Sequence, residues 1–147
     1  MIKNTLEILM WSIALPGFGQ YLNGKYFKGT ILLILEFVIN VQANFNQVIF
    51  LSFHGEISDA IKYTDYQWLM FYPCLYFLSL WDAAKDAGGA KDSYSFIPYI
   101  LTAFLATVGL IFSSKLKIFG VLFGPVWLPI LFVFPGAIIG GIIKIKL

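Results

Sequence analysis

Apolar side chains fill five long runs of this chain, and none of the five contains Asp, Glu, Lys or Arg. The runs cover residues 8–24, 37–55, 66–81, 93–114 and 118–143. The most polar stretches lie around residues 54–67 and 82–95 and are only long enough for loops. Since a helix needs about 20 predominantly apolar residues to cross a bilayer, the pattern predicts membrane helices joined by short polar connections.

The fold class that this pattern predicts is all-α, a polytopic transmembrane helical bundle with four to five membrane segments in one domain. That membrane domain covers residues 1–147, with an N-terminal hairpin at 1–53, a third segment at 66–87, a fourth at 96–114 and a fifth at 118–143. The first apolar run is interrupted by Pro16, Gly17 and Gly19, which permit a tight turn. That run therefore either crosses the bilayer or folds back.

Lysine placement indicates how the bundle is oriented, because cytoplasmic loops collect Lys and Arg. If the first run folds back, one side holds Lys3, Lys25, Lys28, Lys85, Lys91, Lys144 and Lys146, and the other holds Lys62, Lys115 and Lys117. That count is seven to three; if the first run crosses, Lys3 changes sides and the count is six to four. Both alternatives predict a multi-pass plasma-membrane protein with a cytoplasmic C-terminus, and they differ in the side of the N-terminus.

Composition strengthens the membrane interpretation. Charged residues make up 12% of the chain and hydrophobic residues 59%, with a mean hydropathy of +0.81, whereas soluble domains average about 25% charged residues. A net charge of +2, carried by ten scattered lysines, is too small for a nucleic-acid-binding face. The composition excludes a soluble enzyme and a nucleic-acid reader. The expected partners are the lipid bilayer and, beyond it, other membrane proteins or further copies of this chain.

Two short motifs carry a resemblance to a known family. Residues 15–29 read LPGFGQYLNGKYFKG and residues 80–87 read LWDAAKDA. The first is similar to the PG(L/F)GQ-Y-x-G-x-x-x-KG pattern of the TM2-domain family of small membrane proteins, and the second to the D-A-x-x-x-A ending of a later helix in that family. The matching hairpin residues are Pro16, Gly17, Gly19, Gln20, Tyr21, Gly24, Lys28 and Gly29. The resemblance covers about residues 8–88 and implies a short hairpin of membrane helices without catalytic residues. If family members pass the first helix across the bilayer, it also implies an external N-terminus.

Glu36 is the most unusual ionisable residue, because a carboxylate within an apolar helix is costly. Amide side chains follow it at spacings of four, four and three residues, which would share a face on one continuous helix. This stripe consists of Glu36, Asn40, Asn44 and Gln47. One hypothesis is that it lines a polar pathway. We favour the other, a hydrogen bond to a neighbouring helix, because Gln42 and Asn46 spoil the one-sided pattern.

Residues with catalytic or metal-binding chemistry are sparse. Asp82 and Asp86 lie one helical turn apart at the end of the third segment, where interfacial carboxylates on a solvated helix end are the expected reading. A zinc site needs three or four ligands and an activated thiol needs a base, but His54 and Cys74 are the only residues of their types. The sequence therefore predicts no enzyme, no metal site and no cofactor.

Small residues indicate how the last two segments pack. The fifth segment carries Gly120-x-x-x-Gly124 and Gly136-x-x-x-Gly140, and this spacing lets helix backbones approach closely in lipid. We expect these four glycines to pack the fifth segment against the fourth. Prolines within the fifth segment predict a bent helix.

The function that this pattern favours is non-enzymatic. We expect an accessory, scaffold or assembly partner of a membrane complex, in a bacterial-type plasma membrane. The alternative is a subunit of a small-solute or ion transporter or channel that uses the Glu36 stripe. A partner would identify the first, and flux across liposomes would identify the second.

Overall fold

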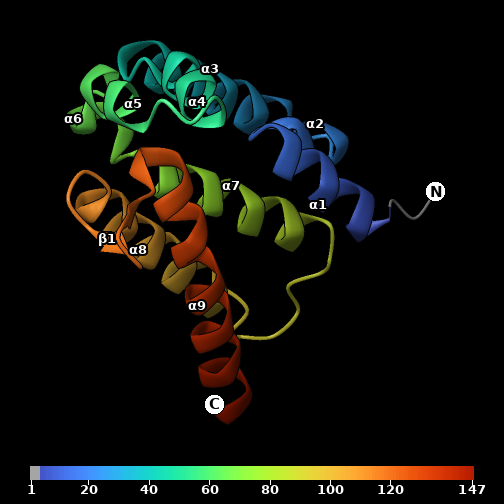
Figure 1. The fold of residues 1–147 in the computed structure, drawn as a ribbon. Coiled ribbons are helices and arrows are strands. Elements are labelled where there is room, and N and C mark those ends of the chain that lie inside the picture. Colours follow the sequence, from blue (N-terminus) through green and yellow to red (C-terminus); the bar gives the residue numbers. More distant parts are fainter. Residues whose placement is uncertain (1–3) are drawn as a thin grey trace.

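Helices account for nearly all regular structure in residues 4–147, the part of the chain that the computed structural model describes (Figure 1). The elements are α1 (Thr5–Ala14), α2 (Phe18–Leu22), α3 (Tyr26–Gln42), α4 (Phe45–Phe53), α5 (Ile57–Tyr63), α6 (Tyr66–Leu69), α7 (Tyr72–Asp86), α8 (Ile97–Phe112), β1 (Lys117–Ile118), β2 (Val121–Leu122) and α9 (Gly124–Lys146). The two short strands pair antiparallel. The predicted all-α class is confirmed, with this small β-hairpin as an addition.

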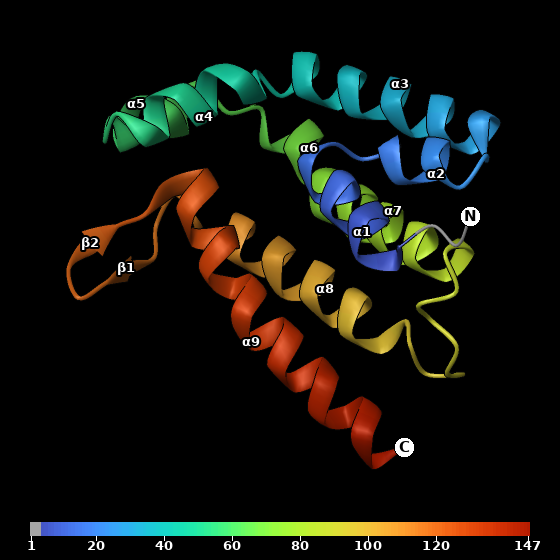
Figure 2. The same ribbon diagram turned by 90° about the vertical axis from the view of Figure 1, so that its right-hand side faces the viewer.

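The helices form two layers with α7 between them. Figure 2 shows α3 and α4 following one another along one side of the molecule and α8 and α9 lying together on the other. Helix α7 packs against α8 on one side and against α1, α2 and α3 on the other, and α8 with α9 is the most extensive helix pair of the described chain.

The expectation of four to five membrane spans is not supported by the observed helix lengths. Within residues 4–147, only α9 is long and apolar enough to cross a membrane, and α3 with α4 adds a second span if that bent pair counts as one. Helices α7 and α8 contain 15 and 16 residues, or about 22 and 24 Å at 1.5 Å per residue. A bilayer core is about 30 Å thick, so neither helix is long enough by itself to cross it.

Backbone conformation explains why the helices are shorter than the runs. Asn44 adopts a left-handed conformation at φ 56°, which ends α3 and bends α4 away from it by 65°. Pro73 and Pro98 lie in the first turns of α7 and α8, where a missing backbone N–H costs little. Proline therefore starts these helices late in their runs. Inside α9, by contrast, two prolines are accommodated in one helix.

Two of the four predicted packing glycines lie against α8. A Cβ atom added at Gly136 would come within 2.7 Å of Thr102 Cα, and one added at Gly140 within 2.5 Å of Pro98 Cα. The other two do not pack there. Gly120 lies in the turn between β1 and β2 at φ 77°, and Gly124 starts α9 against Ile57 of α5. The expectation was wrong for Gly120 and Gly124 because the fifth run begins with the β-hairpin, and α9 starts only at Gly124.

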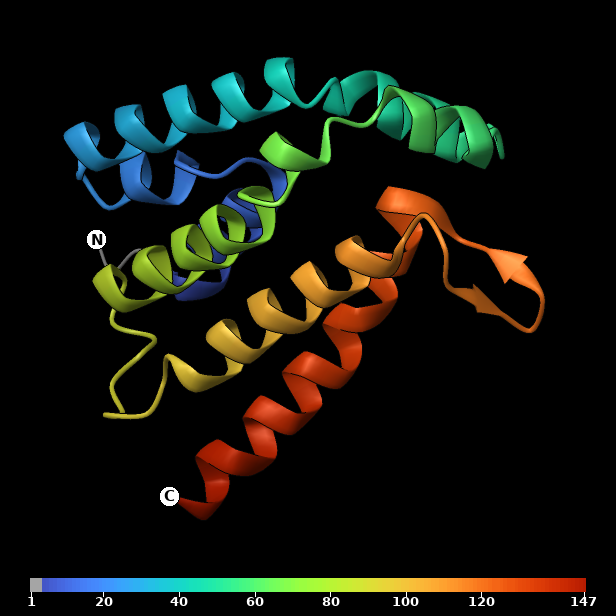
Figure 3. The same ribbon diagram turned by 90° about the vertical axis from the view of Figure 1, so that its left-hand side faces the viewer.

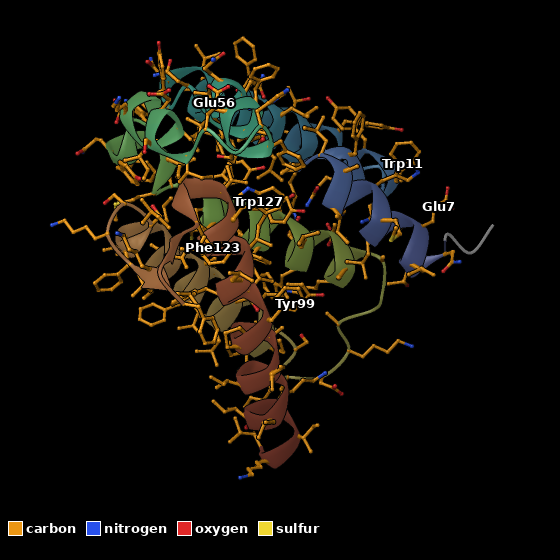
Figure 4. All side chains as sticks on the ribbon, in the orientation of Figure 1. Glu7, Trp11, Glu56, Tyr99, Phe123 and Trp127 are labelled. Atoms are coloured by element: carbon orange, nitrogen blue, oxygen red, sulfur yellow. The ribbon has the colours of Figure 1, made fainter. Side chains whose placement is uncertain are left out.

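A tryptophan of α9 joins the two layers at one end of the molecule. The indole Nε1 of Trp127 donates a hydrogen bond to the Ser52 carbonyl of α4 at 3.0 Å, and its ring contacts Phe53 at a centroid distance of 4.7 Å (Figure 4). Val48, Leu51, Ala60 and Val126 form a buried cluster beside it. Helices α4, α5 and α9 are therefore fixed to one another.

Candidate functional site

The first apolar run folds back on itself along α7. Thr5 Oγ1 donates to the Ala87 carbonyl at 3.2 Å, and Asn23 Nδ2 donates to the Ala83 carbonyl at 2.9 Å. Between them, the Gly17 N–H donates to Ser79 Oγ at 3.2 Å, near the middle of α7. Residues 5–23, here called the N-terminal hairpin, thus begin and end beside the same end of α7. The first apolar run is therefore a hairpin within the protein.

Gln20 is the central side chain of the contact between the N-terminal hairpin and α7. It is fully buried, and its Nε2 donates to the Ser79 carbonyl at 2.9 Å and to Asp82 Oδ2 at 3.1 Å. Its Oε1 finds no hydrogen-bond partner within the described chain. Since a buried amide is costly unless it is hydrogen-bonded, Gln20 fits this position because α7 supplies two acceptors.

Lys28 joins the start of α3 to the same helix. Its Nζ lies 2.7 Å from Asp82 Oδ1 and 3.1 Å from Asp86 Oδ2. The carboxylate of Asp82 therefore accepts from both Gln20 and Lys28. The two aspartates do not form the simple solvated helix end that the sequence indicated, since they face a cation that lies 54 residues from Asp82 in the chain. We call Gln20, Lys28, Ser79, Asp82 and Asp86 the docking cluster.

The motif glycines let the backbones come close enough for these bonds to form. A Cβ atom at Gly19 would lie 1.9 Å from Ser12 Oγ and 2.7 Å from Ala83 Cβ. At Gly29 it would lie 2.5 Å from the Tyr21 ring, whose hydroxyl is 2.6 Å from Thr30 Oγ1. Gly17, at φ 102°, makes the turn between α1 and α2. A side chain at any of these sites displaces a neighbouring element.

The two stretches that resemble the TM2-domain family therefore meet in space. The hairpin motif supplies Gln20 and Lys28 of the docking cluster, and the second motif supplies Asp82 and Asp86. The sequence did not predict this contact or the participation of Ser79 and Asn23 in it. Asn23 lies inside the first motif and Ser79 directly before the second, so their positions beside the motif residues are the only signal that could have found them.

The Glu36 stripe does not lie on one helix face. Glu36 is buried in α3, and its Oε2 has no hydrogen-bond partner in the part of the chain described. Asn44 lies at the break after α3, where its Nδ2 donates to the Tyr63 carbonyl at 3.0 Å. Asn40 Nδ2 donates to Asn46 Oδ1, and Gln47 is exposed on α4. The left-handed residue between α3 and α4 breaks the four-residue periodicity on which the stripe depended.

The other candidate residues lie apart from the docking cluster. His54 Nδ1 lies 2.8 Å from the Phe50 carbonyl at the end of α4, and Cys74 is exposed on α7. Among residues 4–147, no three His, Cys, Asp or Glu side chains group closely enough to hold a metal ion.

A second feature is an apolar cleft of about 580 Å³ between the two layers. Its walls come from α1, α4, α6, α7, α8 and α9, so it exists only after both layers have packed. No short motif marks it, because its lining residues are scattered from Ile13 to Phe134.

No protein-family model, curated protein or solved structure matches this chain. The geometry above therefore defines the site: a helical protein whose N-terminal hairpin is held to α7 by the buried side chains of Gln20 and Ser79, beside a partly exposed ion pair between Lys28 and Asp82.

We predict that the two aspartates contribute unequally to stability. Asp82→Ala removes acceptors for both Gln20 and Lys28 and should lower the free energy of unfolding by about 2 kcal/mol. Asp86→Ala removes only one contact to a half-exposed lysine and should cost less than about 0.5 kcal/mol. Denaturant unfolding in detergent measures both values. Equal losses would show that Gln20 draws no stabilisation from Asp82.

Proposed function

We propose that this chain is a multi-pass integral membrane protein of the TM2-like kind that acts as an accessory, scaffold or assembly partner of a membrane complex. We assign this chain no reaction of its own. Its N-terminal hairpin enters the bilayer from one side and returns to that side. The meeting of the two motif stretches in the docking cluster supports the resemblance to that family.

The observation that carries the membrane part is the distribution of polar and apolar side chains. Buried polar residues lie between the helices: Ser12, Gln20, Glu36, Ser52, Ser79, Thr102 and Ser113. Large apolar side chains are exposed on the outside of α1, α3, α8 and α9. Only 22% of the most apolar window of α9 is buried. Exposed apolar surface on this scale is typical of contact with lipid or a partner, and polar side chains between helices are typical of membrane bundles.

Charge at the two ends of the molecule supports the orientation. Figure 3 shows the start of α3, the end of α7 and the C-terminus toward one end, and α5 and the β-hairpin at the opposite end. The first end carries Lys25, Lys28, Lys85, Lys91, Lys144 and Lys146, and the opposite end carries Lys62, Lys115 and Lys117. By the positive-inside rule, the first end and the C-terminus face the cytoplasm of the plasma membrane.

The opposite end offers the surface on which we expect a partner to dock. Glu56, Asp59 and Asp65 lie on and beside α5, and Figure 4 shows Glu56 among the helices above the start of α9. Helix α5 packs on α4 and α9, and Trp127 ties α9 to α4. This charged surface, on which Lys62 pairs with Asp59 at 3.1 Å, is therefore presented by a fixed set of helices, as a docking surface requires.

The test is purification of the full chain from its native membrane in a mild detergent. We expect a particle with a stoichiometric partner, and we expect the double variant Glu56→Lys/Asp65→Lys to lose that partner. The matched control is Lys91→Glu/Lys146→Glu, which reverses two charges at the other end and should keep it. A homogeneous self-oligomer without a partner would contradict the proposal and favour the transporter alternative, for which loss of flux in Glu36→Gln liposomes is the next measurement.

A further inference from the structure

We propose that the apolar cleft between the two layers holds a single acyl chain of a membrane lipid. The inference rests on the proposed membrane location, because the lipid must reach the cleft from the bilayer.

The chemistry of the walls selects an apolar occupant. None of the residues that line the cleft is charged, and Tyr72 and Tyr76 bring the only side-chain hydroxyls. The Tyr76 hydroxyl is already used, since it donates to the Ile13 carbonyl at 2.8 Å. A water molecule needs two to four polar partners to occupy a cavity, and polar solutes need similar partners. The walls of the cleft therefore favour a hydrocarbon over a polar solute.

The size of the cleft favours a hydrocarbon chain over a helix. Its volume of about 580 Å³ lies within the range of about 300–1,000 Å³ that is typical of small-molecule sites. A helix about 10 Å wide would occupy that volume within about 7 Å of its length, or about five residues. The cleft therefore has room for little more than one turn of a helix from a partner or a second copy, and a narrower hydrocarbon chain fits its volume better.

The position of the cleft gives a lipid direct access. Phe53, Ile130 and Phe134 line it and are also 65%, 44% and 62% exposed. The exposed apolar faces of α4 and α9 thus continue without interruption into the cleft. Apolar side chains in protein interiors are normally closely packed, but the two layers do not contact each other across this cleft. An acyl chain in the cleft supplies the contacts that are missing there.

Photocrosslinking of the full chain tests this inference. The protein is reconstituted into vesicles of phosphatidylethanolamine and phosphatidylglycerol with a trace of phosphatidylcholine that carries a diazirine near the end of one acyl chain. After irradiation, peptide mass spectrometry locates the adducts. Adducts at Phe77 and Pro129 indicate an acyl chain in the cleft, because both residues line it and both are partly buried. Adducts at Phe104 indicate contact with bulk lipid, because this residue is 61% exposed on α8 and does not line the cleft.

Cleft-filling variants make the test specific. Val133→Trp places an indole in the cleft and should reduce adducts at Phe77 and Pro129 about tenfold, while adducts at Phe104 stay unchanged. The matched control is Ile138→Trp, at an exposed position of the same helix that does not line the cleft. It should change none of the three. Ile130→Trp is a second filling variant, and thermal unfolding in detergent shows which variants are folded.

The outcomes separate this inference from the proposed membrane location. Adducts at Phe104 alone would overturn the acyl-chain site and leave the membrane location standing. Adducts at Phe77 and Pro129 that persist in folded filling variants would also overturn it. Absence of adducts at all three positions would overturn the membrane location and, with it, the acyl-chain site.

Discussion

Gly140→Ala is expected to lower the free energy of unfolding by about 2–3 kcal/mol, because the new methyl group has no room between α8 and α9. Its Cβ would lie 2.5 Å from Pro98 Cα, 3.2 Å from Pro98 N and 3.3 Å from the Ile97 carbonyl oxygen. All three are backbone atoms of α8, so no side-chain rotation relieves the contact. The helices must separate, and they form the most extensive pair in the described chain.

The neighbouring glycine is the matched control. A Cβ atom at Gly141 would meet nothing within 4 Å in the described part of the chain. Gly141→Ala should therefore leave stability unchanged or raise it by up to about 1 kcal/mol, since alanine favours helix over glycine. Denaturant unfolding in detergent compares the two variants at the same protein concentration. Similar stabilities for Gly140→Ala and Gly141→Ala would show that α8 and α9 do not approach as closely as the structure has them.

The close approach of α8 and α9 was partly predictable from spacing alone. Gly136 and Gly140 are four residues apart within a run that does form one helix, so they share a face. The same rule was wrong for Gly120, because it assumes that the backbone is helical. Phe119 at φ 50° and Gly120 at φ 77° form a turn there, and apolar composition carries no information about such a turn.

The same assumption explains the error in the number of spans. Hydropathy identifies residues that avoid water, but it does not report where a helix breaks. The run at residues 37–55 reads as one apolar segment, yet the left-handed conformation of Asn44 divides it. Asn adopts this conformation more readily than most residues, so its presence between two amide-rich turns is a signal that sequence reasoning could have used.

The docking cluster could be anticipated only in part. Proline and glycine in the first motif predict the turn at Gly17, whose φ of 102° demands glycine. Nothing in local sequence predicts that Gln20 meets Asp82, because they are 62 residues apart and the contact depends on how the N-terminal hairpin packs on α7. Lys85 is the lysine nearest to both aspartates in the sequence, but its Nζ lies over the Trp81 ring at 4.9 Å.

Gly19→Ala should strongly destabilise the N-terminal hairpin, with a loss of about 3 kcal/mol or more in the free energy of unfolding. The added Cβ would lie 1.9 Å from Ser12 Oγ and 2.7 Å from Ala83 Cβ. Rotation of the Ser12 side chain relieves the first contact, but the methyl of Ala83 cannot move without α7. The N-terminal hairpin must therefore shift away from α7, which also breaks the bonds of Gln20.

Hydrogen exchange distinguishes this local effect from general destabilisation. Gly19→Ala should speed amide exchange in residues 5–23 while α8 and α9 keep their protection, because local opening follows the contacts that are lost. Ala83→Gly in the same chain removes the second clash and should restore part of the protection, even though glycine alone weakens α7 by about 1 kcal/mol. A positive coupling between the two substitutions would place the methyl groups in contact. Uniformly faster exchange throughout the chain, with no recovery in the double variant, would contradict the docking of the N-terminal hairpin on α7.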